Sequence, residues 1–173
     1  MINRYSRKEL RDIWEDRNRY KIWLDIELAA AEGMEKLKII PKGVVKKVRA
    51  KSKIDVEKIL KIEGKVRHDV IAFLTTLIEK AGKEANYLHK GMTSSDVLDT
   101  CFNIQLKESA LIISKDIEIL LKSIKKQAIK HKYTLCIGRS HGIHAEPTTF
   151  GLKLLTFYKE FSRNQKRLKS AIE

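Results

Sequence analysis

A ten-residue segment near the end of the chain combines titratable side chains with a flexible backbone. The segment GRSHGIHAEP, residues 138–147, contains His141, His144 and Glu146 together with two glycines. Histidine titrates near neutral pH and can act as a general acid or base, and glycine lets the backbone approach a substrate closely. Two histidines and a carboxylate could instead ligate a transition metal, or the segment could be an ordinary loop. The segment alone leaves these three alternatives open.

Two further polar clusters precede predicted helices. Arg4 and Tyr5 lie in NRYS, before the first helix, where an arginine, a phenol and free backbone amides would suit a phosphate; the alternative is a frayed terminus. The segment HKGMTSSD begins at His89 and places Thr93 and Ser94 beside the free amides of another helix start. That arrangement would suit an anion or a carboxylate, although ordinary helix capping explains one of the hydroxyls.

The fourth cluster is VRHDV, residues 66–70. Arg67, His68 and Asp69 are consecutive, so they cannot share one helix face and would fan out at a helix start. In a functional interpretation His68 faces a site, Arg67 holds an anion and Asp69 orients a neighbour. The alternative is a triplet of surface residues.

The elements that must position these clusters are predicted to be helices. Ser6 and Glu9 have the spacing of a capping box, Asp55 is a candidate cap, and Gly82 suits a helix C-terminus. Apolar spacings of three and four residues predict helices, and no strand pattern competes with them. Pro147 fits the first turn of a helix. The predicted helices cover residues 6–37, 44–51, 56–63, 66–81, 93–137 and from 147 onward.

Composition narrows the classes of protein to consider. Of the 173 residues, 43% are hydrophobic, which is too many for a disordered chain. The net charge of +14 fits either a solvated lysine-rich surface or an anionic partner. The chain has no recognisable nucleic-acid-binding motif, no CxxC pair, and no apolar run long enough to span a bilayer. Cys101 fits a core position, and we expect a cytoplasmic, all-α protein.

Four segments together resemble the N-terminal part of the adenylosuccinate lyase family, within the fumarase/aspartase superfamily. They occur in family order and cover essentially the whole chain up to about Leu155, and HAEPTTFG is typical of the adenylosuccinate branch. Ser140 stands where the family commonly has threonine. The segments are MINRYSRKEL, GKVRHDVIAF, HKGMTSSDVLDT and GRSHGIHAEPTTFGLKL.

The resemblance implies an all-α fold: a small N-terminal helical domain, residues 1–92, followed by the first long helices of a fumarase/aspartase-type bundle, residues 93–173. It implies β-elimination of fumarate from adenylosuccinate, giving AMP, and from the succinyl aminoimidazole carboxamide ribotide (SAICAR), giving AICAR, in purine biosynthesis. No metal or organic cofactor is implied. The family's flexible loop with its serine base would lie beyond residue 173, and its site is assembled from three subunits of a homotetramer.

The resemblance also assigns roles to residues of this chain. His141 would be the general acid, and His68 would lie near the phosphate or assist proton transfer. The expected substrate-binding residues are Arg4 and Tyr5 for the phosphate, Thr93 and Ser94 for a succinyl carboxylate, and Arg67, Asp69 and His89 lining the site. The alternatives from composition are a basic helical module that binds nucleic acid and an oligomerisation module without catalysis; neither a nucleic acid nor a membrane is the expected partner.

Overall fold

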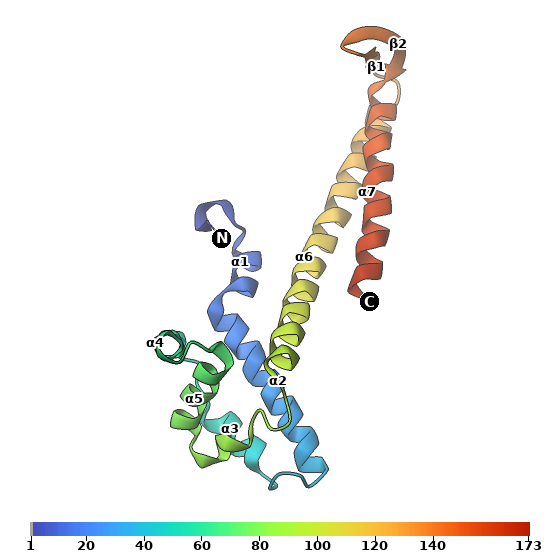
Figure 1. The fold of residues 1–173 in the computed structure, drawn as a ribbon. Helices are drawn as coiled ribbons and strands as arrows, with labels where there is room; N and C mark the ends of the chain where they lie inside the picture. The colour runs from blue at the N-terminus through green and yellow to red at the C-terminus, as the bar shows by residue number, and fades with distance from the viewer. Residues whose placement is uncertain (1) are drawn as a thin grey trace. The chain divides into compact units, whose positions relative to one another are not determined.

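The computed structural model describes residues 2–173, which form two compact units, residues 2–106 and residues 107–173. Apart from one two-stranded sheet, these residues fold into helices and their connections, which confirms the predicted all-α class. Among them, no helix is both long and apolar enough to cross a membrane. The elements, in chain order, are η1 (Asn3–Tyr5), α1 (Lys8–Trp14), α2 (Asp16–Lys36), α3 (Val44–Lys51), α4 (Val56–Val66), α5 (Asp69–Ala81), η2 (Lys83–Tyr87), α6 (Ser94–Lys130), β1 (Leu135–Ser140), β2 (Ile143–Thr149) and α7 (Phe150–Ile172) (Figure 1).

The core of the first unit includes an aromatic cluster between α2 and α5. Tyr20 and Trp23 lie one turn apart on α2, and their ring centroids lie 6.0 and 5.5 Å from that of Phe73 on α5. All three side chains are buried. Aromatic pairs of this kind contribute about 0.5–1.5 kcal/mol each beyond the burial of apolar area. Apolar residues recur every three or four positions on α2 and α5, so each helix has one apolar face. These two faces bring the three aromatic rings together.

Several predicted helix ends are confirmed. Helix α3 has the predicted bounds, and the Asp55 side chain caps α4 by accepting a hydrogen bond from the Lys58 backbone N–H at 3.2 Å. Gly82, with φ of +85°, ends α5. The predicted start of a helix at Val66 is wrong, because α4 ends there. Arg67 adopts a left-handed conformation, and α5 begins only at Asp69.

The N-terminal capping box is also wrong. The hydroxyl of Ser6 donates to the carbonyl of Ile2 at 2.9 Å, and α1 begins without a side-chain cap. The predicted helix over residues 6–37 is divided at Glu15, whose extended backbone separates α1 from α2. The side-chain amides of Asn18 and Gln105 donate to the carbonyl of Ile13 at 3.0 and 2.7 Å, so they satisfy an acceptor that an unbroken helix would have paired.

The second unit contains a β-hairpin where a break between two long helices was predicted. Helix α6 ends at Lys130, not near residue 137, and β1 pairs with β2 in antiparallel register. A bulge places two residues of β2 opposite Gly138, and a Cβ there would lie 2.9 Å from the Glu146 carbonyl oxygen. Pro147 lies within β2 opposite Ile137, so the prediction that it begins a helix is wrong. Each strand of a two-stranded sheet has an unpaired edge, which tolerates proline.

Helices α6 and α7 approach each other closely beside the hairpin (Figure 1). Thr149 caps α7 by accepting from the Leu152 N–H at 3.2 Å, and the Gly151 N–H donates to the His131 carbonyl at 2.9 Å. A Cβ on Gly151 would lie 2.5 Å from the Ala128 carbonyl oxygen and 2.7 Å from the Lys132 Cα. Only glycine fits this contact between backbones.

We predict that Gly151→Ala destabilises the protein by about 1–3 kcal/mol, the usual cost of overpacking, because the methyl group meets backbone. Gly33 lies inside α2 with nothing within 4 Å of its Cβ position. Gly33→Ala is the matched control, and we expect it to stabilise by about 0.5–1 kcal/mol through helix propensity. Denaturant unfolding measures both changes. Equal stabilities for Gly151→Ala and wild type would contradict the close approach.

A second prediction concerns pH and Asp55. Its carboxylate accepts a hydrogen bond from Lys80 Nζ at 2.8 Å, and this contact, followed by the cap to Lys58, lowers the pKa of Asp55. A lowered folded-state pKa stabilises the protein above the ordinary carboxyl pKa, and that stabilisation is lost as the pH falls through the folded-state value. Asp55→Asn keeps a capping oxygen without the charge. The difference in unfolding free energy between wild type and Asp55→Asn should therefore disappear on acidification, and a pH-independent difference would contradict this account.

Candidate active site

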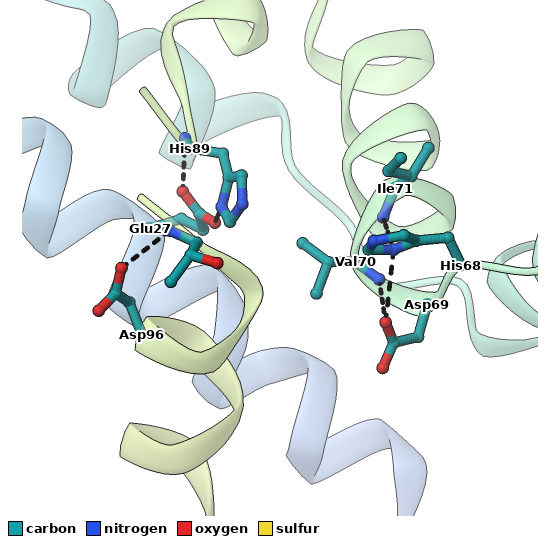
Figure 2. A network of polar contacts seen from close by, with 8 residues as sticks. Glu27, His68, Asp69, Val70, Ile71, His89 and Asp96 are labelled. Atoms are coloured by element: carbon teal, nitrogen blue, oxygen red, sulfur yellow. Dashed lines mark hydrogen bonds and ion pairs between the residues drawn. The ribbon is translucent and has the colours of Figure 1, made fainter. Parts of the chain in front are cut away.

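Glu27 and His89 form a buried contact within the first unit. The Glu27 side chain, on the core face of α2, is fully buried. Its Oε2 accepts from the His89 backbone N–H at 2.6 Å, and its Oε1 lies 2.7 Å from His89 Nδ1 (Figure 2). His89 has a positive φ of 60° and keeps 21% of its side chain exposed. The predicted site histidine is therefore held by a carboxylate 62 residues earlier in the chain.

His68 and Asp69 lie at the start of α5 (Figure 2). His68 Nδ1 lies 3.4 Å from the Ile71 backbone N and 3.6 Å from Asp69 Oδ1, which itself accepts from the Val70 N–H at 2.7 Å. A single nitrogen cannot both accept from Ile71 and donate to Asp69. The shorter contact assigns Nδ1 as the acceptor of a helix cap, so the proton of the neutral ring is on Nε2. Arg67 precedes this cap and is exposed.

Thr93 and Ser94 lie where α6 begins. The Thr93 backbone N–H donates to Asp96 Oδ2 at 2.8 Å, which is one half of a capping box. Thr93 is exposed and Ser94 is half-buried. Two hydroxyls and the first amides of a long helix therefore lie together, as an anionic ligand would require.

Arg4 and Tyr5 form the short helical turn η1. Both side chains are exposed, and the Arg4 guanidinium carbon lies 4.7 Å from the centroid of the Tyr5 ring. The pair presents a cation and a phenol side by side, a combination that can bind phosphate oxygens.

His141 belongs to the second unit, at the tip of the hairpin. His141 and Gly142 are the two turn residues, with φ values of +50° and +79°, as a type I′ turn requires. His141, His144 and Glu146 are all exposed. Across residues 2–173, no three or more histidine, cysteine, aspartate or glutamate side chains are grouped as a metal site would need.

Glu27 is not among the site residues predicted from the sequence. It occurs on the apolar stripe of α2, between Trp23 and Ala31, both of which are buried. A carboxylate on a buried stripe signals a polar partner, because burial of an unpaired charge is costly. The pattern could not identify that partner as His89.

The chain belongs to the lyase family whose model matches residues 3–173. It is 47% identical over 171 residues to the adenylosuccinate lyases of Streptococcus mutans serotype c (strain ATCC 700610 / UA159) and of Bacillus subtilis (strain 168). Each match covers 99% of this chain and 40% of the relative. The chain therefore spans about two fifths of the length of the curated relatives it matches.

Solved structures show the same fold. The fumarate lyase from Mesorhizobium sp. BNC1 superposes with a TM-score of 0.89 at 27% identity, covering 96% of this chain and 41% of that one. The 3-carboxy-cis,cis-muconate lactonizing enzyme from Pseudomonas putida gives 0.87 at 26% identity, covering 96% and 40%. The helical arrangement is therefore shared by enzymes that are named for different reactions.

The cap at His68 yields a prediction about its structural role. His68→Asn should leave stability unchanged or slightly raised, because asparagine is a preferred N-cap, whereas His68→Ala should lose about 1 kcal/mol. Thermal or denaturant unfolding of the two variants measures the difference. If alanine and asparagine were equally stable, Nδ1 would not be acting as a cap.

Proposed function

We propose that this chain is part of an adenylosuccinate lyase, which eliminates fumarate from adenylosuccinate to give AMP and from SAICAR to give AICAR. The observation that carries the proposal is the 47% identity to two adenylosuccinate lyases along almost the entire chain. The four segments that resemble this family also contain every site residue predicted from the sequence. The chain's positive charge suits a substrate with a phosphate and two carboxylates.

The elimination needs a base at the succinyl carbon and an acid for the departing nitrogen. In this proposal His141 is the acid, and its exposed position at a turn leaves the imidazole accessible to a bound substrate. Thr93 and Ser94 bind a succinyl carboxylate, and Arg4 and Tyr5 bind the phosphate.

The remaining first-unit residues line the substrate. Arg67 and Asp69 flank His68, whose Nε2 is not used by the helix cap and is available for the phosphate or for proton transfer. His89 offers its Nε2 to the substrate, because its Nδ1 contacts Glu27. No step in this scheme requires a metal or an organic cofactor.

The proposal includes assembly as a cytoplasmic homotetramer, with the serine base supplied by a segment beyond residue 173. Exposed apolar side chains on α6 and α7 support further assembly, because large apolar surfaces are rarely left uncovered. They include Leu111, Ile119, Ile129, Leu152 and Leu155.

We predict that His141→Asn in the full-length protein lowers kcat for fumarate release by roughly a hundredfold or more, because the proton donor is lost. Asparagine tolerates the left-handed backbone of this turn, so the hairpin should be preserved. An ultraviolet absorbance assay with adenylosuccinate measures the rate.

His131→Asn is the control, since His131 is also near the hairpin but contacts Thr134 and the Phe150 ring and has no assigned site role. It should retain activity within about threefold, as expected for a residue outside the chemistry. Near-normal turnover by His141→Asn would show that another group donates the proton.

A further inference from the structure

We propose that Glu27 is a positioning residue that fixes the backbone, the ring orientation and the tautomer of His89. The inference rests on the proposed function for its consequence in catalysis, but its structural content is independent of the substrate. Glu27 belongs to none of the four clusters that the sequence singled out, and it reaches the site only through His89.

The carboxylate uses both of its oxygens on one residue. Oε2 accepts from the His89 backbone N–H at 2.6 Å and Oε1 contacts the ring Nδ1 at 2.7 Å (Figure 2). The first contact holds a backbone whose φ of 60° is uncommon for a residue with a side chain. The second holds the ring. Two contacts at short range leave the imidazole with one orientation relative to α2.

The same contacts determine which ring nitrogen is presented to a ligand. When Glu27 carries its charge it can only accept hydrogen bonds, and the proton shared at this contact then lies on Nδ1. In the neutral ring Nε2 is then an acceptor, and in the protonated ring Nε2 becomes a donor with its positive charge balanced by Glu27. In both cases the Nε2 edge is the part of His89 that remains available for a substrate group.

Burial explains why this role needs a carboxylate. Glu27 is fully buried and both of its oxygens make hydrogen-bonding contacts to His89, while Trp23 and Leu28 on the same helix are also buried. A glutamine of nearly the same shape offers one accepting oxygen and an NH2 group. Its oxygen could accept from the backbone N–H or from the ring Nδ1–H of His89, but not from both. Its NH2 group would face the other donor, unless the ring proton moved from Nδ1 to Nε2.

The first test is spectroscopic and needs no substrate. Solid-state NMR of the full-length protein, labelled with ¹⁵N-histidine and measured where the ring is neutral, should show His89 with a protonated Nδ1 and an unprotonated Nε2. The His89 signals are identified by their absence in His89→Ala. In Glu27→Gln this pattern should be lost or reversed, whereas Asp25→Asn, an exposed carboxylate on the same helix, should preserve it.

The second test is kinetic. Glu27→Gln should lower kcat/KM for adenylosuccinate by about tenfold or more, chiefly through KM, as expected when a hydrogen bond between charged groups is lost. Asp25→Asn should stay within about twofold of wild type, because surface substitutions away from special features have small effects. In a His89→Ala background, Glu27→Gln should cause no further loss, since residues that act through one another are not additive.

Each outcome tests either the positioning role of Glu27 or the proposed function. An unprotonated Nδ1 in the wild-type protein overturns the positioning role, and it does so even if Glu27→Gln fails to fold. Independent, additive losses in the double variant also overturn it. If the NMR pattern is present and changes in Glu27→Gln but adenylosuccinate is not cleaved, the positioning role stands and the proposed function fails.

Discussion

A buried carboxylate must be satisfied by hydrogen bonds. In the first unit Glu27 meets this requirement through the segment of chain that leads into α6. Glu27 lies on the face of α2 that forms the core, and both of its oxygens contact His89. The contact therefore connects the middle of α2 to the segment that leads into α6. It holds His89 in a left-handed conformation, and within five residues the chain reaches Ser94, where α6 begins. Core packing and the arrangement of the candidate site thus depend on the same carboxylate.

The second unit depends on a different constraint, which is the contact between backbones at Gly151. Because α7 begins in contact with the end of α6, the chain between them must reverse direction within a short distance. The hairpin makes this reversal, with a bulge at Gly138 and a two-residue turn at its tip. His141 occupies the tip, where a left-handed backbone is required and where histidine is more acceptable than most residues. A histidine there satisfies the turn and still presents its ring to solvent.

The sequence predicted best those features that depend on neighbouring residues. The bounds of α3, the cap at Asp55 and the glycine at the end of α5 follow from local propensity and were confirmed. The hairpin was missed because most of its side chains are exposed on both faces, so the apolar alternation that reveals a half-buried strand is absent. Glu27 was missed as a site residue for a complementary reason: helical spacing shows which face is buried, but it does not identify a partner 62 residues away.

Left-handed backbone conformations occur at several of the residues that were predicted to be in the site. Within residues 2–173, four residues other than glycine have a positive φ: Lys38, Arg67, His89 and His141. Three of the four are candidate site residues. A left-handed conformation persists only when its surroundings impose it, and the two histidines show different means of doing so, a buried carboxylate for His89 and a hairpin turn for His141. The conformation of His141 completes the hairpin turn, whereas that of His89 lies outside every helix and strand. For His89, the strain is therefore better explained by where it places the imidazole than by a contribution to stability.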